Sequence, residues 1–450
     1  MRPMDLSRSL FGSARIWFII AALFVGTIAP ARNAGAQEPP SSQRPTPESP
    51  GGAEHPGMST SLRELIQEAE QKNPQIAASF HAWQGSRNVP RQVSALPETQ
   101  VSVQQFSVGS PRPFAGYSNS NFAYIGIGAS QDIPYPGKRQ LRAQVAERES
   151  DSMEAQTDSV RRMVVGNLKI VYFKLAYIQQ TVGVLEKSDQ LLNQVEQATE
   201  ARYRVGQGNQ QDVLKAQLQH TKILQEIAHH HQEEGLLEAQ IKQQLGRSQD
   251  SPDIVAESLS ARSLSFSAPA LFEKAGEHNP DVRSKQASIA QQETQVELAH
   301  KNFRPDFNVQ YMYQHTNGDT RDYYVATFGV RLPNRGRQKA ELAQAQQNQE
   351  RARRELDSES QRVLSEVQQQ YVRAKTSEER LKIYSDGLVP QSEATFRSAL
   401  SAYQSNRQDF ESLLSSFLDV LNLDLEYRNE LVEHESALAE LERLTGVDVP

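Results

Sequence analysis

Hydrophobic residues recur at helical spacing over two very long stretches of this chain. No proline lies between Pro136 and Arg204, and apolar residues there step by four and three: Val160, Val164, Leu168, Val171, Leu175, Ile178, Val182 and Leu185. This heptad spacing is typical of long packed helices. A helix of about 65 residues would extend ~100 Å at 1.5 Å per residue.

A second stretch of this kind runs from Gly336 to about Leu400, and each stretch is followed by another amphipathic segment that ends at Gly246 or Gly446. We therefore expect two helical hairpins, over residues 138–246 and 337–446. Short breaks predict where they turn: Val205, Gly206 and Gln207 in the first, and Ser405, Asn406 and Arg407 in the second.

Alternation with period two replaces the helical spacing in two other segments. Phe307, Val309, Tyr311 and Tyr313 alternate with mostly polar residues, and a similar run ends at Leu332. The Asn-Gly pair between these runs favours a hairpin turn, because both residue types tolerate positive φ. We expect strands at about 306–316 and 322–332, with a weaker pair at about 99–108 and 121–131.

Each expected strand has about 10 residues, which is the length of a tilted transmembrane β-strand. A soluble sheet could contain any one of them. In a membrane, Val309, Tyr311 and Tyr313 would face lipid, while Asn308 and Gln310 would face a lumen. Because closed membrane barrels start at about eight strands, four strands would require several copies of the chain to form a barrel.

The order of segments occurs twice. Asn73-Pro74 and Asn279-Pro280 both follow short amphipathic runs. Tyr203 in the first half corresponds in position to Tyr403 in the second, and Gly246 corresponds to Gly446. Such a period indicates a duplicated architecture. We expect two units of helix, β-hairpin and long helical hairpin, over residues 61–260 and 261–450, in an α+β membrane protein.

The N-terminus has the pattern of a secretory signal peptide. Three arginines precede an apolar run from Ile16 to Ala29, and Ala34-Gly35-Ala36 provides a cleavage site. We expect a signal peptide over residues 1–36, with an uncleaved anchor as the alternative, and a disordered linker rich in proline, serine and glycine over residues 37–60.

Composition narrows the functional classes. The formal net charge is −7, and loss of residues 1–36 removes four arginines and one aspartate, which leaves −10. This balance argues against a nucleic-acid partner. The chain has no cysteine and lacks phosphate-loop, zinc-protease and nucleophile motifs. We therefore expect neither an enzyme nor a cofactor.

Several segments together resemble the TolC family of outer-membrane efflux proteins, over roughly Leu62 to Gly446. The segment from Ser130 to Arg139, which reads Ser-Gln-Asp-Ile-Pro-Tyr-Pro-Gly-Lys-Arg, looks like the strand-to-helix junction of the heavy-metal efflux branch, the cobalt-zinc-cadmium and copper-silver systems. The segments around Gly206 and Asp212 are similar to the first hairpin tip of the family.

The resemblance implies a homotrimer whose four strands per chain form one twelve-stranded β-barrel in outer-membrane lipid, continuous with a periplasmic helical barrel. The protein would be a passive conduit in a tripartite efflux system. Its tips would bind a periplasmic adaptor protein that bridges to an inner-membrane pump of the resistance-nodulation-division (RND) type. Metal cations would be the exported substrate, with drug export or type I secretion as alternatives.

The chain departs from the family pattern at the second tip. Asn406 stands where glycine is usual, and asparagine also enters the left-handed backbone region. Ser412 and Ser415 replace aspartates that ring the tunnel entrance in some members, so Asp212 is the remaining candidate at that entrance.

Two other interpretations bear on function. A periplasmic coiled-coil scaffold is a distant alternative, but such a scaffold has no use for alternating strands. His229, His230 and His231 form the one histidine cluster; because consecutive helical residues point about 100° apart, they cannot converge on one ion, and we assign no metal site.

Overall fold

The computed structural model describes residues 60–107, 123–316 and 321–448. All of them lie in one compact unit, Pro56–Pro450. The expected signal peptide lies outside the described residues, as does the linker apart from Thr60. The expected Asn317-Gly318 turn also lies outside them. So do residue 108, at the end of the strand expected at 99–108, and residues 121–122, at the start of the strand expected at 121–131.

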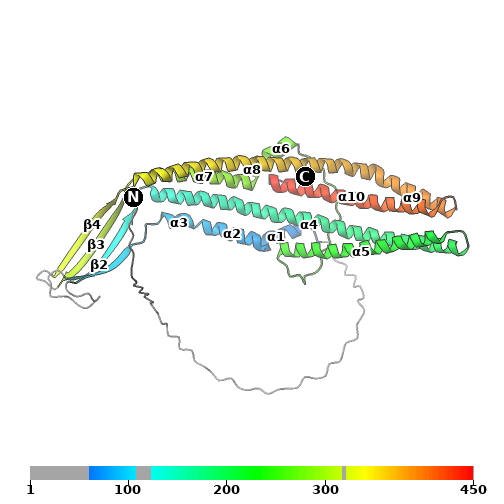
Figure 1. Ribbon diagram of the computed structural model, residues 1–450, viewed down its shortest axis with the longest axis horizontal. Coiled ribbons are helices and arrows are strands. Elements are labelled where there is room, and N and C mark those ends of the chain that lie inside the picture. Colours follow the sequence, from blue (N-terminus) through cyan, green and yellow to red (C-terminus); the bar gives the residue numbers. More distant parts are fainter. Residues whose placement is uncertain (1–59, 108–122, 317–320, 449–450) are drawn as a thin grey trace, which may run out of the picture. The chain divides into compact units, whose positions relative to one another are not determined.

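The first half of the described chain contains seven elements (Figure 1). In order they are α1 (Leu62–Lys72), α2 (Pro74–Ser86), α3 (Val89–Ser94), β1 (Gln100–Phe106), β2 (Tyr124–Ile133), α4 (Lys138–Arg204) and α5 (Gln210–Leu245). The second half follows the same order with α6 (Ala268–His278), α7 (Pro280–Lys301), β3 (Asp306–Thr316), β4 (Asp322–Arg331), α8 (Arg335–Ile383), the π-helix η1 (Tyr384–Leu388), α9 (Val389–Gln404) and α10 (Phe410–Thr445). The predicted fold class, with its duplicated unit, is confirmed.

The four strands form one antiparallel sheet in the order β1-β2-β3-β4. The central pairing joins the two repeats, because Ile133 of β2 lies opposite Phe307 of β3. The second strand, expected at 121–131, is observed at Tyr124–Ile133. The sheet lies at one end of the helices, and the turns of the long hairpins lie at the other end (Figure 1).

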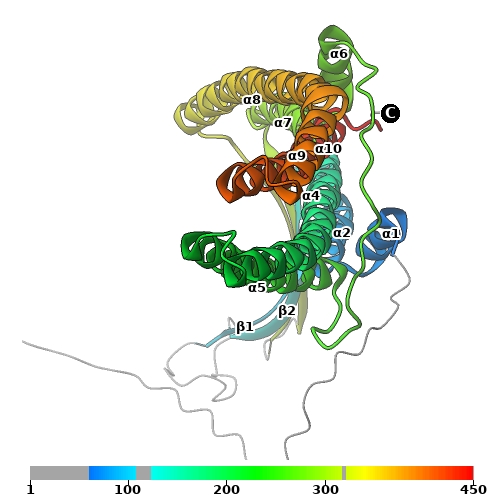
Figure 2. The ribbon, with the colours of Figure 1, turned by 90° about the vertical axis from the view of Figure 1, so that its right-hand side faces the viewer.

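The helices lie side by side in a curved layer when viewed from the hairpin turns (Figure 2). Helix α4 packs against α5, α7 and α10, while α8 packs against α7 and α10. Six of the eight heptad residues predicted on α4 are buried, and Val160 and Val171 are partly exposed. The apolar stripe of α4 therefore supplies much of the core. None of the described helices has an apolar stretch long enough to cross a bilayer.

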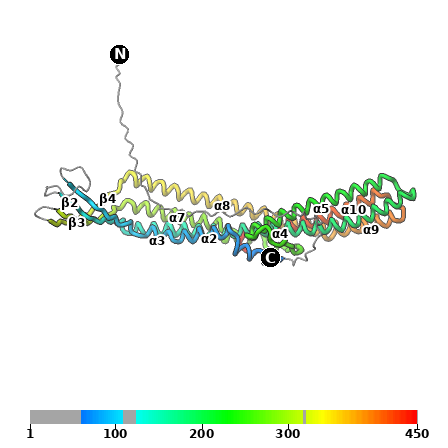
Figure 3. Tube along the Cα trace, turned by 90° about the horizontal axis from the view of Figure 1, so that it is seen from below, coloured from blue at the N-terminus to red at the C-terminus, as the bar shows by residue number. Residues whose placement is uncertain are grey.

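Two asparagines join helices end to end. The Oδ1 atom of Asn73 accepts hydrogen bonds from the backbone N–H groups of Gln75 and Ile76 at the start of α2, while its Nδ2 donates to the carbonyl of Gln244 at the end of α5, at 2.7 Å. Helix ends leave such backbone groups without intrahelical partners. One side chain therefore satisfies the ends of two helices, and α5 continues into α2 as a nearly unbroken rod (Figure 3).

The second repeat contains the same joint. Asn279 caps the start of α7, and its Nδ2 donates to the carbonyl of Leu444 near the end of α10, at 2.9 Å. The side chain of Asn279 is only 2% exposed. The repeated Asn-Pro and glycine positions in the sequence thus mark the two ends of one joint. Helix α5, which ends at Gly246, meets α2, which begins after Asn73; helix α10, which ends at Gly446, meets α7, which begins after Asn279.

The second long helix differs from its expected continuous course. It is widened at η1, where the N–H of Val389 donates to the carbonyl of Tyr384, five residues back. Pro390 explains the difference: it lacks an N–H, and its ring would clash with the carbonyl four residues before it. A π-type turn accommodates both effects.

The link between the repeats, residues 248–266, is attached to both halves. Gln179 of α4 accepts from the N–H of Ala256 and donates to the carbonyl of Ile254, at 2.9 and 2.8 Å. Farther along, Arg262 forms ion pairs with Glu435 and Glu442 of α10, at 2.7 and 2.9 Å. We call residues 248–266 the strap, because they tie α4 to α10.

Candidate functional site

The sheet has two chemically different faces. Residues that lie directly opposite one another in an antiparallel sheet share a face, so the strand register assigns every side chain. One face is largely apolar and carries Val101, Val103, Ile125, Ile127, Ala129, Ile133, Phe307, Val309, Tyr311, Tyr313, Tyr324, Ala326, Phe328 and Val330. Its polar residues are Gln105, Gln131, His315 and Asp322. We call it the apolar face.

The opposite face is largely polar, especially near the helices. Its polar residues are Gln100, Ser102, Gln104, Ser130, Asp132, Asp306, Asn308, Gln310, Gln314, Thr316, Thr327 and Arg331, with glycines at 126, 128 and 329. Farther from the helices the same face also carries Phe106, Tyr124, Met312, Tyr323 and Val325. Cross-strand contacts distinguish the two faces further: Tyr311 and Tyr324 stack on the apolar face at 6.4 Å between ring centroids, whereas Asn308 donates to Asp132 on the polar face at 2.8 Å.

The apolar face is exposed on the single chain. Val309, Tyr311 and Tyr313 are 42%, 52% and 40% exposed, and Phe328 is 66% exposed. An apolar surface of this size marks contact with a membrane or a partner. Strands β1 and β4 are the two edges of the sheet, and on its outer side each has no neighbouring strand among the described residues.

The junction between sheet and helices is held by polar contacts. Lys138, which is 3% exposed, forms an ion pair with Asp306 at 2.8 Å and donates to the carbonyl of Arg304. Arg139 donates to the carbonyl of Ser94 at 2.6 Å. These motif residues, singled out in the sequence, thus connect α4 to β3 and α3. Gly137 before them has φ of +91°, a conformation in which glycine is favoured.

The two hairpin tips share one backbone geometry. Gly206 has φ of +75° and Asn406 has φ of +56°, so both residues adopt the left-handed conformation considered for them. The N–H groups of Gln207 and Arg407 donate to the carbonyls five residues back, which is the Schellman arrangement of helix C-termini. Val205 is 68% exposed, and Gln207, Ser405 and Arg407 are exposed as well.

The tips also contact each other, which the sequence pattern did not indicate. The Arg202 guanidinium lies over the ring of Tyr403, 4.5 Å from its centroid, and donates to the Tyr403 carbonyl and to the side chain of Asn406. Lys215 of α5 pairs with Glu411 of α10 at 2.7 Å. The two hairpins therefore end as one joined unit.

The candidate entrance residues lie in the first two turns of α5 and α10. Asp212 is partly exposed in the first turn of α5, while Ser412 and Ser415 lie on α10. Sequence reasoning missed Asp409, which accepts a hydrogen bond from the Ser412 N–H at 2.9 Å as the N-cap of α10. Hydrogen bonds from Ser412 hold the pKa of Asp409 below its ordinary value. The signal that could have found it is an aspartate three residues before Ser412, at a helix start.

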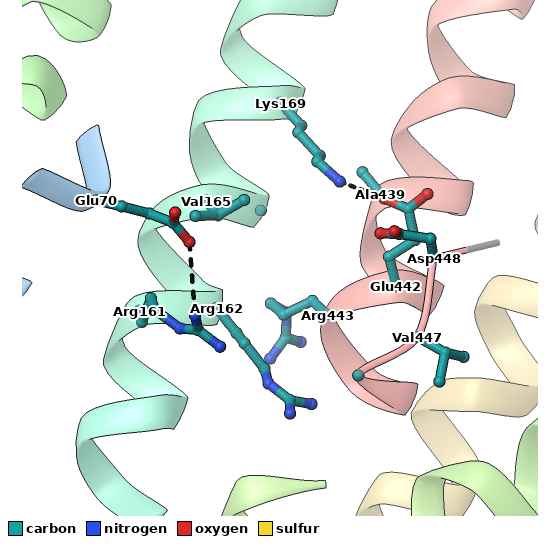
Figure 4. Close-up of a pocket in the computed structure, with 12 residues that line it drawn as sticks. Glu70, Arg161, Arg162, Val165, Lys169, Ala439, Glu442, Arg443, Val447 and Asp448 are labelled. Carbon is teal, nitrogen blue, oxygen red and sulfur yellow. Dashed lines mark hydrogen bonds and ion pairs between the residues drawn. The ribbon is translucent and has the colours of Figure 1, made fainter. Parts of the chain in front are cut away.

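A pocket of about 170 Å³ lies beside α1, α4 and α10 (Figure 4). Arg161, Arg162, Lys169 and Arg443 line it. Each is paired with a carboxylate, Lys169 with Glu442 at 2.5 Å and the arginines with Asp158, Glu70 or Glu440. Two of these ion pairs join helices: Arg161–Glu70 links α4 to α1, and Lys169–Glu442 links α4 to α10. We therefore assign the pocket a structural role.

The histidine cluster makes local contacts on α5. His230 and His231 approach Glu233 and Glu234 at 3.4 and 3.3 Å. Across the parts of the chain that the structure describes, no three His, Cys, Asp or Glu side chains are arranged to hold a metal ion.

A sheet with one apolar and one polar face, carried on long helical hairpins, is the arrangement expected of a membrane channel protein. The family follows from the sequence: the family model described as "Outer membrane efflux protein" matches residues 65–247 and 271–443. The chain belongs to the outer membrane efflux protein family.

Solved structures have the same fold. The outer membrane protein VceC from Vibrio cholerae matches with a TM-score of 0.72 at 18% identity, over 86% of this chain and 97% of that chain. CusC, whose structures are described in terms of conformational changes accompanying folding and transmembrane channel formation, matches with a TM-score of 0.73 at 15% identity, over 90% of this chain and 98% of that chain. The outer-membrane channel OprN matches with 0.73 at 16% identity, over 86% and 91%. A search of curated proteins finds no match.

Proposed function

We propose that three copies of this chain form an outer-membrane efflux channel, in which each copy contributes its four strands to one closed barrel and its long helices to a periplasmic tunnel. The observation that carries this proposal is the sheet, which has an apolar face, a polar face and two open edges. Unpaired backbone groups are very costly in hydrocarbon, so membrane strands form closed barrels. Four strands are too few to close one.

The absence of cysteine from the chain allows a direct test. Ser102→Cys on β1 and Thr327→Cys on β4 place one thiol on each edge strand, and further pairs shifted along the two strands sample the register between copies. On oxidation in outer membranes, a matched pair should give covalent trimers on a denaturing gel. Single-cysteine variants are the control and should stay monomeric. Only monomers across the whole series, or an open ladder of larger polymers, would contradict the closed trimer.

At the other end of the molecule, we propose that the tips dock a periplasmic adaptor protein that bridges to an inner-membrane pump of the RND type. Exposed residues at both tips, among them Val205 and Arg407, support this assignment. The contacts of Arg202 with Tyr403 and Asn406 support it further, because they hold the two tips together as one surface. The pump supplies the energy, and the channel is passive.

Metal cations are the cargo that we propose. The proposal rests on the resemblance around Gln131 to Arg139 and on the −10 charge expected without residues 1–36, since an acidic conduit attracts cations. The structural contacts of Lys138 and Arg139 account for those two residues without reference to cargo. Asp212 would supply one carboxylate per chain at the entrance.

The cargo is tested by growth inhibition of a deletion strain with zinc, cobalt, cadmium, copper and a panel of hydrophobic drugs. We expect sensitisation to metals above all, with partial rescue by the Asp212→Asn variant and full rescue by the unaltered gene. Sensitivity to drugs alone would refute the metal assignment and leave the channel assignment intact.

A further inference from the structure

Positive charge is concentrated where the sheet meets the helices. Residues 87–99, 132–142, 300–306 and 331–341 together contain eleven lysines and arginines but only four aspartates and glutamates, in a chain whose formal net charge is −7. These four segments contain all the chain that enters or leaves the sheet at its helical end. We call their basic residues the basic collar.

Internal ion pairs account for only part of the basic collar. Lys138 pairs with Asp306, Arg331 with Asp132 and Arg337 with Glu341. The collar residues Arg91, Arg304 and Arg335 are exposed, and no described carboxylate forms an ion pair with them. The collar thus presents free positive charge to its surroundings.

The stability of the helices does not explain this placement. Helices α4 and α8 begin at the collar, have no acidic residue in their first turns and start with Lys138-Arg139 and Arg335. Cations at a helix N-terminus oppose the helix dipole. By contrast, α5 and α10, which begin at the tips, have Asp212 and Glu411 in their first turns. The basic residues at the collar therefore act against helix stability and favour an anionic partner outside the chain.

The apolar face adjoins the collar directly. Ile133, Phe307 and Val330 are the last residues of that face before the helices. Two exposed leucines continue the apolar character into the collar: Leu96, 47% exposed, and Leu332, 79% exposed. Apolar residues beside basic ones form the pattern of a membrane surface, where side chains meet acyl chains at one level and headgroups at the next.

We infer that the basic collar binds the phosphate headgroups of anionic phospholipids in the leaflet that adjoins the helices. This inference rests on the proposed function, because it requires the apolar face to lie in lipid. Each exposed Lys or Arg near an anionic lipid surface contributes about 1 kcal/mol of binding free energy, which corresponds to an about fivefold preference for anionic over neutral headgroups. The collar would anchor the channel at a fixed depth.

The test uses the full protein reconstituted into vesicles of phosphatidylcholine and phosphatidylglycerol in equal parts. The lipids that stay bound after mild detergent extraction are counted by native mass spectrometry. We expect the protein to retain phosphatidylglycerol in several-fold excess. A triple variant, Arg91→Gln with Arg304→Gln and Arg335→Gln, should lose most of that excess.

A matched control removes the same charge elsewhere: Lys187→Gln with Lys222→Gln and Arg373→Gln, all exposed residues on helices away from the collar. It should retain phosphatidylglycerol like the unaltered protein. Equal retention of both lipids by the unaltered protein, or equal loss in both triple variants, would overturn the inference.

Two further outcomes separate the alternatives. Soluble glycerol 3-phosphate should not displace the bound lipid; full displacement would identify a site for free phosphate in place of a lipid surface. Failure of the unaltered protein to insert into these vesicles would refute the proposed channel itself, whereas insertion without lipid preference would refute only the lipid-binding collar.

Discussion

At the residue scale, the asparagine joints make the sharpest prediction. In Asn279→Asp, the two carboxylate oxygens can still cap α7, but the N–H donor to the carbonyl of Leu444 is lost and a carboxylate faces that carbonyl in a buried site. We expect the free energy of unfolding to fall by about 1–3 kcal/mol, the usual cost of leaving a buried polar group unsatisfied. Thermal unfolding followed by circular dichroism measures the loss.

Asn334→Asp is the matched control. Asn334 caps α8 in the same way, with bonds from Gly336 and Arg337, but it is exposed. A carboxylate there is compatible with the helix dipole, so the control should be neutral or slightly stabilising. Equal destabilisation of both variants would show that the joint to Leu444 contributes nothing.

The tip glycine supports a second prediction at this scale. A side chain at Gly206 would meet no atom within 4 Å, so its φ of +75° is the source of strain. The left-handed conformation costs an L-residue roughly 1–2 kcal/mol. Gly206→Val should therefore distort the tip and abolish export in a complementation assay, while the trimer persists on a gel.

Gly183→Val provides the comparison for the tip. An added Cβ at Gly183 also meets nothing within 4 Å, but this residue lies inside α4 with ordinary helical backbone angles. Export should continue in this variant. Normal export by Gly206→Val would remove the first tip from the docking surface.

At the element scale, the strap makes the stability of the fold depend on pH. Glu238 of α5 lies beside Asp253 of the strap, near Lys242, whose Nζ is 3.3 Å from Asp253. Burial of the carboxylate, and next the charge of Asp253, raises the pKa of Glu238 from 4.5 to about 7. Because the folded protein holds this proton more tightly than the unfolded chain does, the stabilisation is present below about pH 4.5 and is lost as the pH rises to about 7.

Glu238→Gln should remove this dependence. We expect its melting temperature to exceed that of the unaltered protein at pH 8 and to match it near pH 4. Glu186→Gln, at an exposed position on α4, should leave the pH profile unchanged. A Glu238→Gln profile that parallels the unaltered protein across this range would contradict the role of Glu238.

The elements differ in how far the sequence could predict them. The long helices and the strands could be predicted because each shows a local period in the sequence. Leu168 belongs to a series of apolar residues at heptad spacing, and Val309 belongs to a series that alternates with polar residues. The contacts between distant segments leave no such pattern: Asn73 and Gln244 are 171 residues apart, and Arg202 meets Tyr403 across two hairpins. At the tips, left-handed geometry could be anticipated from residue type at Gly206 and Asn406, whereas the joining of the tips could not.

At the scale of the whole molecule, the strand register predicts which substitutions prevent assembly in a membrane. Val309 lies on the apolar face and Gln310 on the polar face. Val309→Arg should cost about 2–4 kcal/mol near the bilayer midplane and reduce the yield of trimer. Gln310→Arg should be tolerated, because the polar face lines the lumen in the proposed channel. The amount of trimer extracted from outer membranes measures both, and equal loss would contradict the assigned faces.

The asparagine joints also bear on the order in which the chain becomes structured. Asn73 meets the end of α5 and Asn279 meets the end of α10, so each joint lies entirely within one repeat. The first repeat can complete its rod as soon as Gln244 has emerged, before most of the second repeat exists. The pairing of β2 with β3 must wait for the second half, as must the packing of α4 against α7 and α10. The duplication thus divides one long-range folding problem into two successive, shorter ones, in keeping with the way large proteins fold unit by unit.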